Sequence, residues 1–515
     1  MAPPAGPCLE AKLEAAIAHH QSGRLQEAEK LYKEIIRTDP EHADAIHLLG
    51  VIAHQSGHRQ IAIDLINEAI DIDSSNPLYY SNLGEAHLAL WEIPEAVECY
   101  QSALELSPEL ASAHCNLGKA LKLQGETDGA EVALERAIAI DPRLPAAHFA
   151  LGDLYADRGD LVPAERELGI CVELDPGRRE AATLLALVKE AQGQYDQAAE
   201  ILLSRLRNDR SAERKIPAEY ESFYTTSAGK LNHDAQQLDY LVSREILPES
   251  FQSIGKECLE LVARAPDRSK THAFNIGRMA SPGFLNSYNR LHHHRETPGI
   301  AKGAVNSRLD FPAIEAAFFH KGRRCTYFDG LLSAEALAEL QSFCLESTIW
   351  YKVEHEDEVG SVVADGFSCP LLFQISNEIR RNLPNIIGSK VLRNAWSYRY
   401  YGKAPGVRAH MDNGEISVNF WITPDAANLD PDSGGLIIWN KRGPSEYARN
   451  TKDQADAILQ RLLADPGTRE EHLPYRCNRA VVFDALTIHG TDDFKFKPGY
   501  ENHRTNITLL YGPPR

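Results

Sequence analysis

The sequence predicts a multidomain α + β protein with an N-terminal α-solenoid, a helical bridge and a C-terminal barrel or two-sheet jelly roll. Three observations lead to this prediction. A 34-residue period runs through the first part of the chain, its register is lost after about residue 212, and short alternating strands begin near residue 319. We therefore expect four segments, an N-terminal tail, a repeat region, a bridge and a strand-rich domain, at 1–8, 9–212, 213–318 and 319–515.

The period is carried by turn residues and by small residues. One turn position recurs every 34 residues, and four of its members precede proline: Asp39, Asp73, Ser107, Asp141, Asp175 and Asp209. Glycine and alanine keep the same spacing: Gly50, Gly84, Gly118 and Gly152, and Ala28, Ala62, Ala96, Ala130, Ala164 and Ala198. Proline ends a unit because it denies the next helix an N–H, and small residues let paired helices approach closely. The pattern predicts stacked two-helix units.

This spacing, with its best match in SNLGEAHLALWEIPEAVECYQSALELSP, resembles tetratricopeptide repeats. The resemblance gives six units: 9–42, 43–76, 77–110, 111–144, 145–178 and 179–212. Such solenoids bind peptides and protein segments on a concave face, which implies a protein or peptide partner. Asn82 and Asn116 share one repeat position. Either they hold a bound peptide backbone, as stacked asparagines do in related solenoids, or they are polar residues of helix packing.

The composition excludes several classes of partner. Lys and Arg number 54 against 73 Asp and Glu, a net charge of −19, which argues against nucleic acid or anionic membrane as a main partner. The N-terminus lacks a basic region followed by an apolar run, and no segment is long enough to span a bilayer, so we expect a soluble cytoplasmic protein. The nine cysteines include no CxxC pair, which favours reduced thiols over disulfides or a thiolate zinc site.

The bridge and the start of the last segment have their own patterns. Stretches such as DAQQLDYLVSREI and SIGKECLELVAR read as amphipathic helices. Three consecutive histidines, 292–294, cannot converge on one ion because neighbouring side chains point in different directions, so we expect a solvated cluster. CTYFDGLLSAEALAELQSF predicts a strand followed by a helix capped at Ser333.

Short strands then dominate the sequence. The clearest are VLRNAWSYRYYG, ISVNFWIT, GGLIIW, AVVFDAL and RTNITLLYG. Several short strands separated by Gly, Pro, Asn and Asp turns are typical of a barrel or a two-sheet jelly roll.

A possible metal site lies among these strands. Residues i and i+2 of a strand face the same way, so His410 and Asp412 can point together while Met411 faces the other side. His489 follows a strongly apolar strand 77 residues after Asp412. Two imidazoles and one carboxylate suit Fe(II) and leave positions open on the metal, whereas a closed structural zinc site uses four protein ligands. The alternative is that these are satisfied structural polar residues.

Arg504 comes 15 residues after His489, in phase with Asn506 on the final strand. The ordered set His410-Met411-Asp412, His489 and Arg504 resembles the 2-oxoglutarate and Fe(II)-dependent oxygenases. The resemblance covers roughly residues 320–515 and implies a double-stranded β-helix, or jelly roll, that uses Fe(II), 2-oxoglutarate and O₂. The whole layout is similar to an uncharacterised, prolyl-hydroxylase-like bacterial group that joins tetratricopeptide repeats to this oxygenase domain.

The resemblance also implies which residues bind 2-oxoglutarate. Arg504 would pair bidentately with its far carboxylate, and the alternative is a salt bridge to a neighbouring acid. A tyrosine hydroxyl would assist: Tyr398 and Tyr400 share one face and Tyr401 the other, and the sequence does not choose among them. Asn419 and Trp421 either line the pocket or belong to ordinary packing.

Two questions stay open at this level. The polar insert at 440–479 is either a lid or substrate clamp, or surface decoration. The favoured function is hydroxylation of a C–H in a protein or peptide substrate recruited by the repeats. There are three alternatives. The protein is an interaction adaptor with an inactive oxygenase fold, an oxygenase acting on a small molecule, or a metal hydrolase that uses the same triad.

Overall fold

The computed structural model describes residues 6–211, 216, 221–265, 273–353, 358–401, 403–404, 409–444, 447 and 452–513. The chain divides into two compact units, Met1–Tyr155 with Arg166–Gly177, and Ala156–Glu165 with Arg178–Arg515. No helix in the described ranges combines the length and the apolar character that crossing a membrane requires.

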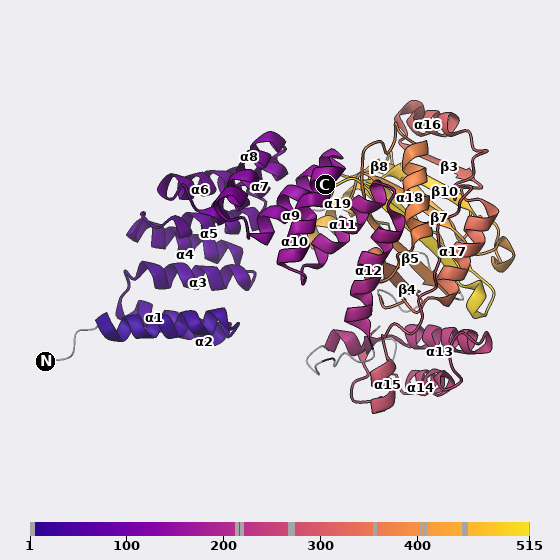
Figure 1. Ribbon diagram of the computed structural model, residues 1–515, viewed down its shortest axis with the longest axis horizontal. Helices are drawn as coiled ribbons and strands as arrows, with labels where there is room; N and C mark the ends of the chain where they lie inside the picture. The colour runs from indigo at the N-terminus through magenta and orange to yellow at the C-terminus, as the bar shows by residue number, and fades with distance from the viewer. Residues whose placement is uncertain are drawn as a thin grey trace. The chain divides into compact units, whose positions relative to one another are not determined.

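The first unit is a solenoid of paired helices, as the period predicts. Successive helices stack side by side in Figure 1. They are α1 (Gly6–Gln21), α2 (Leu25–Thr38), α3 (Ala43–Gln55), α4 (Arg59–Ile72), α5 (Pro77–Ala89), α6 (Ile93–Leu106), α7 (Ala111–Gln124) and α8 (Thr127–Ile140), followed by α9 (Pro145–Arg158) and α10 (Leu161–Leu174), which cross the unit boundary. The predicted helical solenoid is confirmed.

The periodic glycines mark the closest helix contacts. A Cβ on Gly84 would lie 2.7 Å from a ring carbon of Tyr100, and one on Gly118 would lie 2.5 Å from Cγ of Leu134. Both distances are shorter than a carbon–carbon contact allows. Glycine is therefore required where the first helix of a repeat crosses the second.

The second unit begins with the last helix pair and the bridge. Its helices are α11 (Arg179–Ala191), α12 (Tyr195–Arg210), α13 (Ala228–Ser243), α14 (Phe251–Ala263), α15 (Pro282–Ser287) and α16 (Phe311–Phe319), with the 3-10 turns η1 (Glu221–Tyr224) and η2 (His320–Gly322). A short ladder joins β1 (Thr225–Thr226) to β2 (Phe274–Asn275). The described part of the bridge is thus mainly helical.

The rest of this unit is rich in antiparallel strands, as predicted. A six-stranded sheet has the order β3-β10-β7-β13-β5-β4, and a three-stranded sheet has the order β11-β8-β9. The strands are β3 (Cys325–Asp329), β4 (Glu358–Val362), β5 (Leu392–Tyr400), β6 (Lys403–Ala404), β7 (Ile416–Trp421), β8 (Leu436–Arg442), β9 (Glu470–Leu473), β10 (Arg479–Asp484), β11 (Thr487–Thr491), β12 (Phe494–Lys495) and β13 (Arg504–Tyr511). Short 3-10 turns lie between them: η3 (Val363–Asp365), η4 (Asp425–Ala427) and η6 (Tyr500–Asn502).

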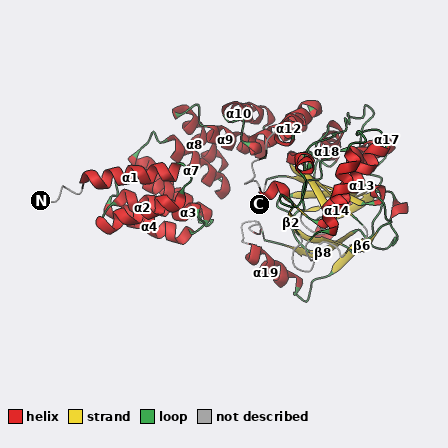
Figure 2. Ribbon diagram, turned by 90° about the horizontal axis from the view of Figure 1, so that it is seen from below, coloured by secondary structure: helices red, strands yellow, loops and turns green. Residues whose placement is uncertain are grey.

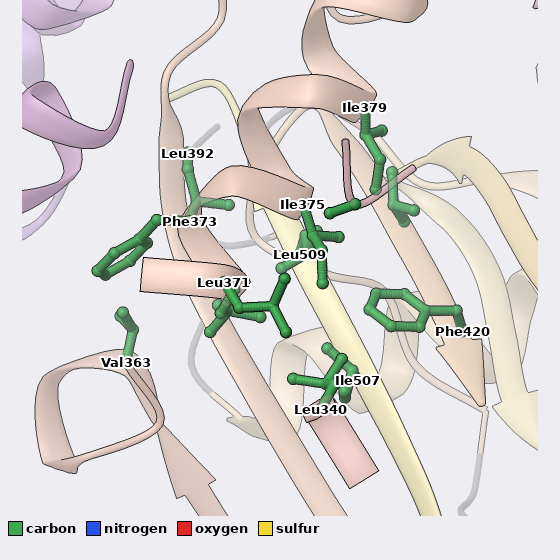
Figure 3. Close-up of a cluster of buried hydrophobic side chains, with 14 of the residues drawn as sticks. Leu340, Val363, Leu371, Phe373, Ile375, Ile379, Leu392, Phe420, Ile507 and Leu509 are labelled. Carbon is green, nitrogen blue, oxygen red and sulfur yellow. The ribbon is translucent and has the colours of Figure 1, made fainter. Parts of the chain in front are cut away.

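Helices cover the strands in Figure 2, among them α17 (Ala334–Glu346) and α18 (Pro370–Asn382), while α19 (Lys452–Leu463) lies in the insert. The predicted cap is confirmed, because the Ser333 side chain accepts a hydrogen bond from the Ala336 N–H. One face of the six-stranded sheet packs against α17 and α18, where Leu371 and Ile375 meet Ile507 and Leu509 (Figure 3).

The last helix pair belongs to this same core. Leu202 and Leu206 of α12 are buried in the cluster that contains the sheet and α18. The Asn377 side-chain amide donates hydrogen bonds to the carbonyls of Glu190 and Ala191, at 2.6 and 3.1 Å. These bonds satisfy carbonyls that a helix leaves unpaired at its C-terminus. The repeat register ends near residue 212, but the second unit already includes the helix pair that starts at Arg179.

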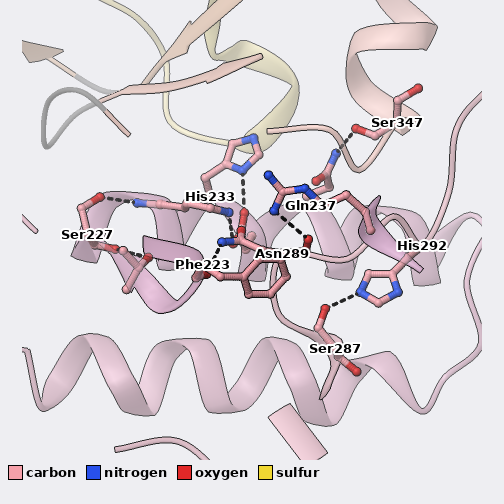
Figure 4. Close-up of polar contacts among 12 residues, drawn as sticks. Phe223, Ser227, His233, Gln237, Ser287, Asn289, His292 and Ser347 are labelled. Atoms are coloured by element: carbon pink, nitrogen blue, oxygen red, sulfur yellow. Dashed lines mark hydrogen bonds and ion pairs between the residues drawn. The ribbon is translucent and has the colours of Figure 1, made fainter. Parts of the chain in front are cut away.

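Polar contacts hold the bridge in place (Figure 4). Gln237 on α13 donates to the carbonyl of Ser347 at 3.0 Å, and His292 contacts the carbonyl of Ser287 at 2.8 Å. The expectation of a solvated histidine cluster is wrong. The three histidines are half-buried, and His292 packs on Phe251, because the segment runs between helices that cover it.

The role of the periodic glycines can be tested by one substitution at two sites. Gly118→Ala is expected to lower the free energy of unfolding by about 1–3 kcal/mol, because the new methyl collides with Leu134. In Gly169→Ala on α10 the new Cβ has no atom within 4 Å. This variant is expected to raise the free energy of unfolding by about 0.5–1 kcal/mol, because alanine favours a helix more than glycine does. Chemical denaturation of both variants measures the difference, and equal effects would contradict the packing argument.

Candidate metal centre

Backbone pairing brings the three predicted ligands together. His410 and His489 form an isolated antiparallel bridge, exchanging N–H···O hydrogen bonds of 2.8 and 3.0 Å. Their ring centroids lie 4.3 Å apart. The Asp412 carboxylate lies 3.5 Å from Nε2 of His489 and 4.0 Å from Nε2 of His410. One ligand atom from each residue lies within 4.8 Å of the other two, and this is the one such group found among the described residues.

His489 is held in the form that binds a metal. Its Nδ1 contacts the carbonyl of Thr487 at 3.0 Å, so Nδ1 carries the proton and Nε2 presents a lone pair. The ring packs on Phe483. Burial, with the nearby His410, lowers the pKa of His489 to about 4. The imidazole is therefore neutral near pH 7, as ligation requires.

Asp412 is oriented by a hydroxyl. Ser417 Oγ donates to Asp412 Oδ2 at 2.6 Å, and the Asp412 N–H donates to the carbonyl of Ala485 at 2.9 Å. Both partners are buried. Such contacts fix the ligand's direction before a metal arrives. The donor set, two neutral imidazoles and one carboxylate on one side, fits a divalent transition metal and leaves further positions open on it.

The three ligands open into a cavity of about 300 Å³. Every second residue of a strand lines this cavity, since residues i and i+2 point the same way. Its walls are drawn from both sheets and include Asn394, Trp396, Tyr398, Tyr400, Asn419, Asn506 and Thr508 from the six-stranded sheet, and Leu436, His489 and Thr491 from the three-stranded sheet. The site residues predicted on β5, β7 and β13 thus share one chamber with the triad, or lie beside it.

Arg504 is buried without an acidic partner. Its side chain is 1% exposed, and it donates to the carbonyls of Gly434 and Gly435 at 2.7 and 3.3 Å. Among the described residues it forms no ion pair, and its Nη1 has no hydrogen-bond acceptor. The ring of Tyr400 lies 5.1 Å from its guanidinium carbon. The alternative of a structural salt bridge therefore has no support within the described part of the chain.

Further polar atoms that lack a hydrogen-bond partner among the described residues lie on the same face of the six-stranded sheet. Trp421 Nε1, Asn419 Oδ1 and Asn506 Oδ1 are buried and lack a partner among the residues described. Trp421 pairs with Asn506 across β7 and β13 and lies 5.9 Å from the guanidinium carbon of Arg504. Its indole N–H is a hydrogen-bond donor. The sequence does not decide whether this side chain lines the pocket or belongs to ordinary packing. The alternation Ser417, Asn419, Trp421 is the signal that could have assigned it.

The tyrosines separate as the alternation suggests. Tyr398 and Tyr400 both line the cavity, whereas Tyr401 packs on His503 on the other side. Tyr400 is the one next to Arg504. The structure thus places Tyr400 at the arginine and Tyr398 nearer the open part of the chamber.

The insert helix packs beside the candidate metal ligands, and its role as a lid or clamp stays a prediction. Leu459 of α19 forms a buried cluster with Met411 and Ile488, each of which adjoins a metal-ligand residue in sequence. Ala409 and Trp439 pack at its edge. The described part of the insert thus packs against residues next to His410 and His489.

Asn82 and Asn116 lie apart from this site, in the solenoid. The Asn82 amide contacts His47 Nε2 at 2.8 Å, and the Asn116 amide donates to Glu85 at 2.8 Å. Both amides therefore link neighbouring repeats, which favours the helix-packing interpretation of the two asparagines.

The hydroxyl behind Asp412 gives a test of ligand orientation. Ser417→Ala is expected to weaken metal binding by about 10–100-fold, because Asp412 loses the donor that orients it. Ser397→Ala removes a similarly buried hydroxyl, bonded to the Asn506 carbonyl at 2.8 Å, and serves as the matched control. Titration with Co(II) measures both affinities. An equal loss in both variants would mean that the effect is general destabilisation.

Comparisons with known proteins address the N-terminal region. The family described as "TPR repeat" matches residues 92–125 and 120–159, and "Tetratricopeptide repeat" matches residues 19–84. No curated protein matches the sequence.

Several solved structures are similar over part of the chain. One is titled "Functional Characterization of Pseudomonas Aeruginosa pilF" (20% identity, 39% of this chain, 90% of that chain, TM-score 0.36). Another is MamA (25% identity, 31% and 94%, TM-score 0.28), and a third is YrrB, "a TPR protein with an unusual peptide-binding site" (21% identity, 32% and 86%, TM-score 0.27). At TM-scores below 0.5 these likenesses support no statement about function. From the family matches, the N-terminal region of the chain carries tetratricopeptide repeats, which generally bind proteins or peptides and indicate a protein-interaction role.

Proposed function

We propose that the chain is a non-haem Fe(II), 2-oxoglutarate-dependent dioxygenase that hydroxylates a C–H of a protein or peptide substrate. One observation carries the proposal. A two-histidine, one-carboxylate triad lines a chamber together with Tyr400, and the ring of Tyr400 lies 5.1 Å from the guanidinium carbon of buried Arg504, which forms no ion pair among the described residues. The triad suits Fe(II), and the arginine suits the far carboxylate of 2-oxoglutarate.

The strand order supports a double-stranded β-helix, or jelly roll. One ladder runs β5-β13-β7-β10, and another is formed by His410 with β11, β8 and β9. Two antiparallel ladders that line one chamber are the arrangement expected of this fold. The mouth of the chamber is then the end that carries the metal ligands.

The metal would be held by His410, Asp412 and His489. When bound, Fe(II), 2-oxoglutarate and O₂ supply the oxidising chemistry: 2-oxoglutarate gives succinate and CO₂, and one oxygen atom enters the substrate C–H as a hydroxyl. The chain's own residues then have to position and shield, since no protein acid or base is required.

The co-substrate would extend from the metal towards Arg504. The guanidinium Nη1 and the Trp421 indole N–H are buried donors that lack acceptors among the described residues, and a carboxylate would supply them. Tyr400 lies beside the guanidinium, and Asn419 and Asn506 line the chamber wall. Burial of this group keeps water from competing for the carboxylate.

An interaction adaptor is the second candidate, since the repeats by themselves indicate a protein-interaction role. Its oxygenase fold would be inactive. The first experiment is an anaerobic titration of metal-free full-length protein with Fe(II) and 2-oxoglutarate. We expect the weak visible charge-transfer band of the chelate, and its loss in His410→Ala. Well-folded, metal-loaded protein that shows no band would favour the adaptor.

Arg504 separates a 2-oxoglutarate enzyme from a hydrolase with the same triad. Arg504→Ala is expected to weaken 2-oxoglutarate binding by about a hundredfold or more, because the bound carboxylate would lose its buried charged partner, while metal affinity stays unchanged. Arg504→Lys keeps the charge without the planar fork and is expected to bind with intermediate affinity. Calorimetry on Co(II)-loaded protein measures both constants. Unchanged binding in Arg504→Ala would argue against the assignment.

A third form of the proposal keeps the enzyme and replaces the protein substrate by a small molecule, with the repeats serving assembly. The chamber alone does not distinguish the two substrates. A charged hollow near the chamber bears on this choice.

A further inference from the structure

A second, larger hollow is lined by strands β8 and β11, and β11 carries His489 of the candidate metal centre. It has a volume of about 720 Å³. We call it the basic depression, because six of its lining residues are cationic: Lys321, Arg323, Arg324, Lys441, Arg442 and Arg469. Its acidic lining residues are Glu470 and Glu471. This excess of positive charge stands out on a chain whose net charge is −19.

Strand register places the basic depression beside the metal ligands. Ile438, in its wall, pairs directly with His489, and Arg442 pairs with Thr487. Thr487 also lines the depression, and its carbonyl is the partner of His489 Nδ1. A chain seated in the depression therefore lies next to the strand that carries a metal ligand.

Part of the positive charge is balanced within the protein. Arg324 and Arg442 share the buried carboxylate of Asp484, at 3.2 and 3.1 Å, so one negative charge faces two positive ones.

Two further pairs account for other cations. Arg323 pairs with Glu471, and Lys441 pairs with Asp465 at 3.0 Å.

Two exposed cations, Lys321 and Arg469, form no ion pair with any residue that the structure describes. Each lies on a different segment, one before β3 and one before β9. Positive charge left over in a hollow attracts an anionic partner and orients its approach.

The shape favours an extended chain over a single small anion. The cations come from three separate segments, 321–324, 441–442 and 469. β3 and β9 are the last strands of their sheets, and the apolar Ile438 and Trp439 lie between the charged walls. Edge strands and alternating pockets are the features by which proteins bind extended peptides.

We propose that the basic depression binds acidic residues of the polypeptide that is hydroxylated at the metal centre, so that the substrate is an acidic peptide segment. The inference rests on the proposed dioxygenase function for its chemistry. The binding surface itself can be tested without turnover.

The probe is a short fluorescein-labelled peptide rich in glutamate and aspartate, used with the full-length protein at low ionic strength. A peptide of equal length with lysine at the acidic positions tests charge, and a single-stranded oligonucleotide tests a different anionic polymer. Fluorescence anisotropy gives each affinity. The test variant is Lys321→Glu with Arg469→Glu, which breaks no ion pair among the described residues.

The control variant is Lys302→Glu with Arg308→Glu, which makes the same change of charge at exposed positions that do not line the depression and form no ion pair among the described residues. We expect the acidic peptide to bind the wild type and the control alike, and to bind the test variant about tenfold or more weakly at low salt. The lysine peptide is expected not to bind. If the charge reversal unfolds the protein, Lys321→Ser with Arg469→Ser probes the same surface.

Three results would overturn the inference: no binding of the acidic peptide, equal weakening in the control, or tighter binding of the oligonucleotide. The chelate band with Fe(II) and 2-oxoglutarate, recorded on the same samples, keeps the two proposals apart. A band without peptide binding rejects only the basic depression. Peptide binding that depends on Lys321 and Arg469, without a band, rejects only the dioxygenase.

Discussion

The candidate metal centre depends on one backbone pairing, the antiparallel bridge between His410 and His489. Two hydrogen bonds of 2.8 and 3.0 Å hold residues that are far apart in sequence at the same level, and so set both rings on one side. A slip of one residue would turn each imidazole to the opposite face. Everything that holds this register therefore acts on metal binding. The α19 cluster packs behind Met411 and Ile488, and Asp484 holds the turn before β11 by accepting the Leu486 N–H and pairing with two arginines.

The second constraint is electrostatic. A guanidinium removed from water without a counter-ion is costly, and the contacts around Arg504 compensate only in part. Nε donates to the carbonyl of Gly434 and Nη2 to that of Gly435, and the rings of Tyr400, Trp421 and Phe494 lie near the cation. One nitrogen still lacks an acceptor among the described residues. An anionic group placed there would give this nitrogen the hydrogen-bond acceptor that the described residues do not provide.

The sequence predicts those features that repeat or alternate. The helical solenoid follows from the 34-residue period and the strands from alternation. His410 and Asp412 do lie together, but the expected strand is absent there: His410 forms an isolated bridge with His489, and Asp412 lies between that bridge and β7. What it could not supply are contacts made across the fold by residues without a local signature. Asn82 finds His47 one repeat away, and the insert helix finds Met411, because both depend on three-dimensional packing rather than on spacing. The burial of the 292–294 histidines was missed for the same reason, since a polar run carries no sign of the helices that cover it.

The buried arginine also bears on the choice between enzyme and adaptor. An adaptor uses its outer surface, and a buried guanidinium that forms no ion pair with the described residues would lower its stability through the cost of removing the charge from water. The same holds for the unpaired indole N–H of Trp421 and the amide oxygens of Asn419 and Asn506, which lie on one strand face with the arginine. A ligand that carries a carboxylate would account for these groups together, because they would bind it. The position of the arginine beside Tyr400, which lines the chamber of the candidate metal triad, is therefore easier to account for in a 2-oxoglutarate enzyme than in a scaffold.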